Sequence, residues 1–203
     1  MAPFRLGFRV CDRRYPFLWS QPGQPGGRWN RPDDPPRHYL ASSPLVAWAE
    51  WLRHQEIHDP EDLEGVAAAL WAVLLPPNWG PETLPLVDLP ETVVLSDEAG
   101  AQEQRRVAIT RLQRQGAQGL QAPTAALIER QSHPCRRCGD GLEEPAALGE
   151  PPLVFVLWCP AETLLGWSCV QEGHPWPDLL PLVRRLGGAP GLRLAQSGAG
   201  DRA

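Results

Sequence analysis

Residues 37–55 constrain the fold more than any other segment, because they contain the start and the end of one element and the start of the next. Two prolines at positions 35 and 36 disfavour a helix and Tyr39 favours a pleated surface, so we predict a short strand over 37–42. Ser43 is a good N-cap and Pro44 is tolerated at the first helical position. A helix should therefore follow the strand directly and continue to about Gln55.

Side chains suited to a nucleotide lie around this strand and helix. Gly27 allows a ligand to approach the backbone closely, and Arg28 beside it offers a planar fork of donors that suits a phosphate. Tyr39 adds an aromatic ring from the strand. Glu50 lies two turns into the helix, and the small Ala47 one turn before it leaves room for a ligand. These residue types together predict a nucleotide site.

The same side chains suit one particular reaction. Cleavage of an N-glycosidic bond builds positive charge on a ribose, which a carboxylate such as Glu50 can stabilise. Arg28 would hold the adjacent phosphate, and Tyr39 would stack on the base that leaves. The alternative is purely structural, because most aromatic residues near a helix belong to the core and most helical glutamates face water. Spacing alone favours this structural alternative.

Several motifs resemble the RES domain family, which is named for an Arg, a Glu and a Ser. They are R-Y-P-F-L-W at 14–19, G-G-R-W-N at 26–30, Y-L-A-S-S-P at 39–44, A-x-A-E at 47–50 and, more weakly, G-W-x-x-V-x-E-G at 166–173. The resemblance implies an α+β fold similar to ADP-ribosyltransferases, with a split β-sheet core and surrounding helices. It also implies a protein that consumes NAD or ADP-ribosylates a protein, and several members are toxins paired with a helix-turn-helix antitoxin.

By matching position, the resemblance makes Arg28, Tyr39 and Glu50 the catalytic residues. The expected Ser falls on Thr124, which keeps the hydroxyl but adds a methyl group and is stiffer at χ1. Without the resemblance, Thr124 would be interpreted as an N-cap for the turn after it. Arg9 on the first predicted strand and Gly27 complete the set expected to bind NAD, which is the substrate.

Length and charge indicate one domain without a nucleic-acid partner. The 203 residues, 42% of them hydrophobic, are ample for a single core. We expect a domain over 1–187 with an insertion at 131–152, and a disordered tail over 188–203. The formal net charge of −5 gives no global basic field to attract nucleic acid. No stretch approaches eighteen consecutive apolar residues and no signal peptide is evident, so we expect a cytoplasmic protein without membrane contact.

The cysteines contain the main rival signal. Five cysteines are an odd number, which argues against a secreted disulfide framework. Cys135 and Cys138 form a C-x-x-C pair near His133, which is half of a zinc site. The second half is missing, because Cys159 and Cys169 are expected to be buried in strands. We therefore expect no metal, and a small zinc-stabilised binding module stays a rival hypothesis.

The remaining elements follow from apolar periodicity and turn residues. His54, one turn after Glu50, is a candidate for orienting that carboxylate. The strands at 153–158 and 164–170 are apolar enough for burial on both faces. We expect further strands at 4–11, 70–75 and 120–122, and helices at 59–68, 102–115 and 177–186.

The sequence supports two function classes. The first is an NAD glycohydrolase, NAD phosphorylase or ADP-ribosyltransferase, according to whether the acceptor is water, phosphate or a protein side chain, and no short motif identifies the acceptor. The second is a catalytically silent nucleotide-binding or interaction protein on the same fold. Thr124 in place of Ser and the cysteine-bearing insertion favour this second class.

Overall fold

The computed structural model describes residues 5–128 and 151–186. The elements in chain order are β1 (Leu6–Asp12), β2 (His38–Ala41), α1 (Pro44–His54), α2 (Pro60–Leu63), β3 (Ala68–Leu74), α3 (Glu91–Leu95), α4 (Ala99–Arg114), β4 (Gly119–Pro123), β5 (Leu153–Leu157), the 3-10 helix η1 (Ala161–Thr163), β6 (Leu165–Gly173) and the 3-10 helix η2 (Pro177–Leu182). Helices and strands are mixed along the chain, which confirms the predicted α+β class.

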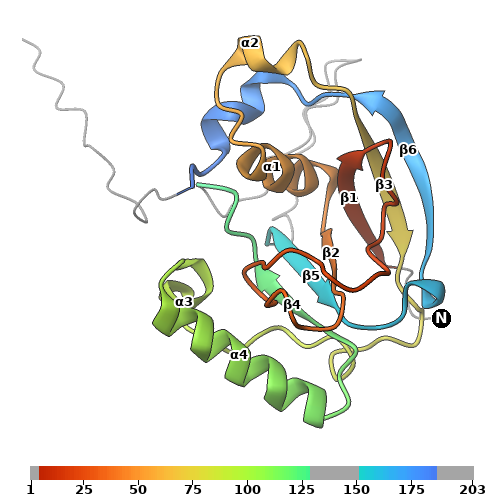
Figure 1. Ribbon diagram of the computed structural model, residues 1–203, viewed down its shortest axis with the longest axis vertical. Coiled ribbons are helices and arrows are strands. Elements are labelled where there is room, and N and C mark those ends of the chain that lie inside the picture. Colours follow the sequence, from red (N-terminus) through yellow and green to blue (C-terminus); the bar gives the residue numbers. More distant parts are fainter. Residues whose placement is uncertain (1–4, 129–150, 187–203) are drawn as a thin grey trace, which may run out of the picture.

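The strands of the described residues form one antiparallel sheet in the order β4-β5-β2-β1-β3-β6. β1 pairs with β3 along its whole length, from Leu6 to Asp12, but it meets β2 only where Phe8 lies opposite Ala41. The sheet therefore divides into two halves, β4-β5-β2 and β1-β3-β6, which splay apart in the ribbon view (Figure 1). This division agrees with the split sheet that the sequence predicted.

Helix α1 packs over the place where the two halves meet. Its start follows the predicted rule, because the Ser43 hydroxyl accepts a hydrogen bond from the Val46 amide at 3.3 Å and Pro44 is the first helical residue. Trp48 and Leu52 of this helix join Val10 of β1 in one buried cluster. Burial of this apolar stripe fixes the helix on one face of the sheet, which we call the helix face.

A second cluster extends the helix face to the other half of the sheet. It joins α3 and α4 to β4 and β5, which lie side by side in Figure 1. Side chains alternate along a strand, so Tyr39 and Ala41 of β2 point to the same face. Tyr39 belongs to this cluster and Ala41 to the α1 cluster, so both clusters lie on the helix face. The buried members of the second cluster are Trp29, Val87, Val94, Ala108, Ile109, Leu112, Ala117, Leu120, Ala122, Val154 and Val156.

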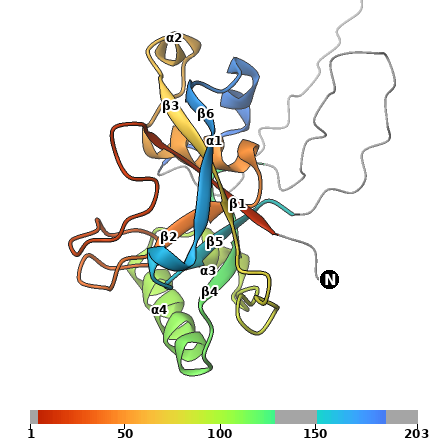
Figure 2. The same cartoon turned by 90° about the vertical axis from the view of Figure 1, so that its right-hand side faces the viewer.

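The opposite face of the sheet is covered by loops, and we call it the loop face. Its cluster includes Leu18 from the segment after β1, Leu40 of β2, Leu84 from the segment after β3 and Leu157 of β5. Figure 2 shows the segment between β1 and β2 standing out from the sheet as a long loop. The sheet is thus packed on both faces, but only the helix face receives α1, α3 and α4.

Three sequence predictions were wrong. The helix predicted over 59–68 ends at Leu63, because Ala68 instead begins β3 opposite Asp12. The closing helix predicted over 177–186 is the 3-10 helix η2, which contains Pro181 and so lacks a backbone donor there. β6, with Cys169, was expected to be buried, but it is an edge strand in which Cys169 is exposed and the exposed fraction of Leu165 is 66%.

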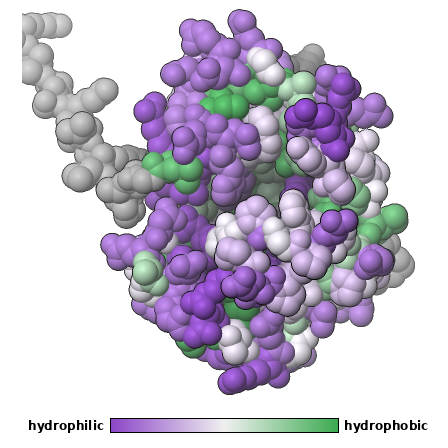
Figure 3. Space-filling view, viewed as in Figure 1, coloured by the Kyte–Doolittle hydropathy of each residue, from purple (hydrophilic) through white to green (hydrophobic). Residues whose placement is uncertain are grey.

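The surface and the ends of the chain add little to the site. The face seen in Figure 3 is mostly hydrophilic, with small and separate apolar areas. Within 5–128 and 151–186 there is no helix of the length and apolarity needed to cross a membrane. The expected tail over 188–203, and His133, Cys135 and Cys138 of the expected insertion, lie outside the described residues.

Candidate functional site

Glu50 and Thr124 meet although 74 positions separate them in the sequence. Glu50 comes from α1, and its side chain is 23% exposed. Thr124 directly follows β4 and is buried, and its hydroxyl donates a hydrogen bond of 2.5 Å to Glu50 Oε1. The same hydroxyl accepts from the Ala126 amide at 3.0 Å, so its proton is directed at the carboxylate. Thr124 therefore both closes the turn after β4 and orients Glu50.

The second oxygen of Glu50 lies near His54. His54 lies one turn later, and its Nε2 is 3.9 Å from Glu50 Oε2, which is beyond hydrogen-bond distance. The His54 side chain is 66% exposed. His54 is thus near the carboxylate but does not hold it, and Thr124 is the residue that does.

Arg28 is anchored at the end of α3. Its Nη1 donates to the carbonyl oxygens of Val94 at 3.0 Å and Ser96 at 2.9 Å, which a helix end leaves without intrahelical partners. Its Nη2 donates to Asp97 Oδ1 at 2.7 Å. From α4, the Arg105 guanidinium donates to the Arg28 and Ser96 carbonyls. One edge of Arg28 therefore supports the scaffold, and the other holds a carboxylate.

Arg53 and Asp97 extend this charged group, and the sequence reasoning missed both. Arg53 lies three residues after Glu50, so they share a side of α1. Its Nη2 is 3.7 Å from Asp97 Oδ2. Burial and the neighbouring Arg28 lower the pKa of Arg53, while Glu50 and Asp97 raise it. The helical spacing from Glu50 was a signal for Arg53, whereas no local pattern marks Asp97.

Tyr39 and Gly27 shape the turn that carries Arg28. The Tyr39 hydroxyl donates to Asn30 Oδ1 at 2.7 Å and accepts from the Trp29 amide at 3.1 Å. A Cβ on Gly27 would lie 2.8 Å from that Asn30 oxygen, so the turn requires glycine. Burial raises the pKa of Tyr39, which keeps the phenol protonated as a donor. Tyr39 thus pins the turn, and its ring packs beside the buried Trp29.

Arg9 lies apart from these residues. Phe8 and Val10 of β1 pack in the α1 cluster, so Arg9 between them points to the loop face. It lies opposite Trp71 of β3. Burial lowers its pKa, and its Nη1 has no hydrogen-bond partner among the described residues. The structure therefore brings Gly27, Arg28, Tyr39, Glu50 and Thr124 to the helix face, but it does not bring Arg9 there.

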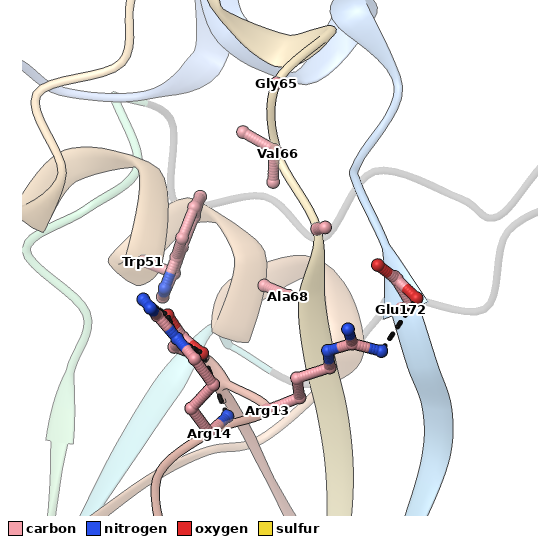
Figure 4. A pocket seen from close by; sticks show the side chains of 9 residues that line it. Arg13, Arg14, Trp51, Gly65, Val66, Ala68 and Glu172 are labelled. Carbon is pink, nitrogen blue, oxygen red and sulfur yellow. Dashed lines mark hydrogen bonds and ion pairs between the residues drawn. The ribbon is translucent and has the colours of Figure 1, made fainter.

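A cleft of about 380 Å³ opens elsewhere, between α1 and the end of the sheet (Figure 4). Arg13 and Arg14 line it, but Arg13 pairs with Glu172 at 3.0 Å and Arg14 with Asp12 at 2.6 Å. Figure 4 shows these pairs on opposite sides of the opening, with Trp51 beside one of them. The charges of this cleft neutralise each other. The Glu50 group, by which we mean Arg28, Glu50, Arg53, Asp97 and Thr124, does not line it.

The Glu50 group combines two electrostatic functions. Its carboxylate is suited to stabilise a developing positive charge, and the guanidinium groups of Arg28 and Arg53 are suited to bind an anion. Within the part of the chain that the structure describes, no three or more His, Cys, Asp or Glu side chains gather as metal ligands. The arrangement fits a substrate with a cationic reacting centre next to an anionic group.

Comparison with known proteins gives a family. No curated protein matches the chain. Among solved structures, a chain of the M. tuberculosis MbcT-MbcA toxin-antitoxin complex is similar, with a TM-score of 0.46, 16% sequence identity and coverage of 89% of each chain. The model of the RES domain family matches residues 5–138, which contain Arg28, Glu50 and Thr124. Because this match spans more than half of the 203 residues, the protein belongs to the RES domain family.

Proposed function

We propose that this protein cleaves the bond between nicotinamide and ribose in NAD. The observation that carries the proposal is the Glu50 carboxylate, oriented by the Thr124 hydroxyl at 2.5 Å and set beside the buried Arg53. NAD has a cationic nicotinamide ribose bonded to an anionic diphosphate, which matches the two functions of the site. The proposed substrate is available in the cytoplasm, where the sequence analysis expects the protein to be.

In the proposed reaction, Glu50 acts on the transition state of the bond cleavage. As the bond from ribose C1′ to the nicotinamide nitrogen breaks, its electron pair leaves with nicotinamide, and positive charge develops on the ribose. The Glu50 carboxylate stabilises that charge, and Thr124 holds it in the required orientation. An acceptor then donates an electron pair to C1′ and loses its proton. With water as the acceptor the product is ADP-ribose, and with phosphate it is the 1-phosphate of ADP-ribose. With a protein side chain as the acceptor the product is an ADP-ribosylated protein.

The other residues position the substrate. Arg28 contacts the diphosphate through the edge of its guanidinium that now holds Asp97. Gly27 keeps the backbone beside it open. Tyr39 acts mainly through the turn that it pins, because its hydroxyl is occupied by Trp29 and Asn30. It is therefore a positioning residue in this proposal, and any contact of its ring with nicotinamide is additional.

Nicotinamide release tests this function. Purified wild-type protein and Glu50→Gln are incubated with NAD, with and without phosphate, and nicotinamide is quantified by chromatography. Loss of the stabilising charge should slow release by about 100-fold or more. Glu103→Gln is the matched control, because it removes one exposed carboxylate whose ion pairs among the described residues are with Arg31 and Arg106. Equal rates for wild type and Glu50→Gln would refute the proposal, and acceleration by phosphate would select phosphorolysis.

A second candidate function is a silent nucleotide-binding protein. The observation that favours it is that Arg28 and Glu50 already have protein partners, namely Asp97 and Thr124. Binding of NAD without release of nicotinamide, even with phosphate and candidate protein acceptors present, would support this candidate over the enzyme.

We also propose a protein partner, a helix-turn-helix antitoxin, and a toxic role for the free protein. Membership of the RES domain family supports this part of the proposal. Expression alone should arrest growth of a host cell, and co-expression with the product of an adjacent reading frame should restore it. Growth arrest by Glu50→Gln to the same extent would contradict a toxicity that depends on NAD cleavage.

A further inference from the structure

Asp97 connects the buried Arg53 and the half-buried Arg28 on the helix face. Its Oδ1 lies 2.7 Å from Arg28 Nη2, and its Oδ2 lies 3.7 Å from Arg53 Nη2. The Asp97 side chain is 60% exposed, whereas those of Arg28 and Arg53 are 14% and 5% exposed. A carboxylate from the surface thus lies over two guanidinium groups from the interior.

Arg53 has more donors than partners. Its Nε is buried without a hydrogen-bond partner among the described residues, and the 3.7 Å contact with Asp97 is longer than a hydrogen bond. Burial of a guanidinium without full hydrogen bonding costs free energy. Arg184 lies close enough for its charge to lower the pKa of Arg53. Glu50 and Asp97 raise that pKa, so the three guanidinium groups of Arg28, Arg53 and Arg184 outnumber the two carboxylates beside them.

We propose that Arg53, together with Arg28, binds the diphosphate of the dinucleotide, and that Asp97 occupies this anion site in the free protein. This inference rests on the proposed function and adds a residue and an internal competitor to it. Arg53 lies one turn after Glu50 on the same side of α1, so the diphosphate would lie next to the ribose that Glu50 faces. This order matches the covalent order of ribose and diphosphate in NAD.

Asp97 is placed to leave the site without disrupting the fold. It belongs to the short connection between the end of α3 at Leu95 and the start of α4 at Ala99. Arg28 Nη1 keeps its bonds to the carbonyls of Val94 and Ser96 whether or not Nη2 holds Asp97. A phosphate oxygen can therefore replace the Asp97 carboxylate while Asp97 turns to water. Removal of the Asp97 charge should then strengthen anion binding.

Calorimetric titration with ADP-ribose tests this site, because ADP-ribose has the diphosphate but no bond to cleave. Loss of charge-assisted hydrogen bonds in Arg53→Gln should weaken binding about tenfold. Asp97→Asn should bind severalfold more tightly than wild type, which is opposite to the effect of losing a structural ion pair. Two controls should bind like wild type: Arg13→Gln, which changes the other cleft, and Glu103→Gln, which changes the net charge as Asp97→Asn does.

Two results would overturn the inference: equal affinity of Arg53→Gln and wild type, or weaker binding by Asp97→Asn. If Arg53→Gln fails to fold, as circular dichroism would show, the direction of change in Asp97→Asn decides. Adenosine, which lacks the diphosphate, should bind both Asp97→Asn and wild type equally, and a gain for adenosine would also overturn the inference.

Nicotinamide release from NAD by wild type, measured in parallel, separates this inference from the proposed function. If binding of ADP-ribose depends on Arg53 but no nicotinamide is released, the proposed anion site is supported and the proposed cleavage of NAD is refuted. If nicotinamide is released but the affinity for ADP-ribose does not depend on Arg53, the cleavage of NAD is supported and the anion site is refuted. Absence of ADP-ribose binding by wild type refutes the anion site as well.

Discussion

The two faces of the sheet both contain buried basic side chains, but these have different partners. On the helix face, Arg28 and Arg53 share the exposed carboxylate of Asp97. On the loop face, His38 is buried and Arg9 is half-buried, and Arg9 Nη1 and His38 Nδ1 have no hydrogen-bond partner among the described residues. A surface carboxylate is a partner that a ligand can replace. The helix-face charges therefore have a partner that a ligand can displace, whereas the buried Arg9 Nη1 and His38 Nδ1 atoms of the loop face have none among the described residues.

This difference assigns different consequences to mutations on the two faces. Changes around Glu50 should act mainly on nicotinamide release and ligand affinity. Changes at Arg9 and His38 should act mainly on the free energy of unfolding, because burial of an unpaired charge or polar group is costly. A change at Arg28 should affect both ligand affinity and the free energy of unfolding, since Arg28 also donates to carbonyl oxygens at the end of α3.

After Glu50 itself, the largest effect is expected for Thr124→Val, which keeps the shape but removes the hydroxyl that donates to Glu50 and accepts from the Ala126 amide. Loss of this hydrogen bond to a charged group should cost about 2 kcal/mol in the transition state, or about 30-fold in kcat, with little change in KM. Thr124→Ser keeps the hydroxyl and is the control. Steady-state kinetics of nicotinamide release would measure both, and full activity of Thr124→Val would show that Thr124 does not position Glu50.

A smaller effect on stability is expected for Arg28→Met. This change leaves the Val94 carbonyl without its donor, removes one of the two arginine donors to the Ser96 carbonyl and removes the pair with Asp97, so unfolding should become easier by about 1.5 kcal/mol. Arg31→Met removes only an exposed pair with Glu103 and should cost less than about 0.5 kcal/mol. Urea unfolding compares the two variants. Equal stabilities would contradict a scaffold role for Arg28.

On the loop face, Arg9→Met should leave stability unchanged or raise it by about 1 kcal/mol, because it replaces a half-buried guanidinium, whose buried Nη1 has no partner among the described residues, with an apolar side chain of similar length. Nicotinamide release should not change. Thermal unfolding and the release assay measure the two effects. A loss of ADP-ribose affinity in Arg9→Met would contradict the division between the faces and return Arg9 to the site that the sequence predicted for it.

The smallest effect concerns His38, whose pKa is lowered by burial. The folded protein therefore favours neutral His38, and the unfolded chain takes up a proton more readily as the pH falls below about 6.5. Stability should be fully present above that pH and decrease below it, by at most about 1.4 kcal/mol per pH unit. His38→Gln should weaken this acid dependence in melting temperatures measured between about pH 7 and pH 5. An unchanged dependence would show that other groups cause it.

Local signals were enough to predict β2 and α1. The prolines before β2 and the Ser43-Pro44 start of α1 act over a few residues, so neighbouring residues decide them. By contrast, residues 64–68 were assigned to a helix that continues from the start signal at Asp59 and Pro60, yet Ala68 pairs with Asp12 in the sheet. Sheet pairing over 56 positions overrode that local preference, which no short window shows.

The candidate site shows the same contrast between residues that local signals predicted and contacts that depend on distant parts of the chain. Glu50 and Arg28 were predicted from motifs, and the resemblance supplied Thr124. The contact between Glu50 and Thr124 depends on where β4 ends relative to α1, and the contact between Arg28 and Asp97 depends on how α3 packs. Asp97 has no motif around it, so its place between two arginines became visible only in the structure.

The most direct test of the account is a crystal structure of Glu50→Gln with NAD, in which slow cleavage preserves the substrate. We expect the ribose C1′ of the nicotinamide half to face position 50, the diphosphate to contact Arg28 and Arg53, and Asp97 to point to water. NAD bound on the loop face at Arg9, or in the cleft at Arg13, would contradict the assignment of the site to the helix face.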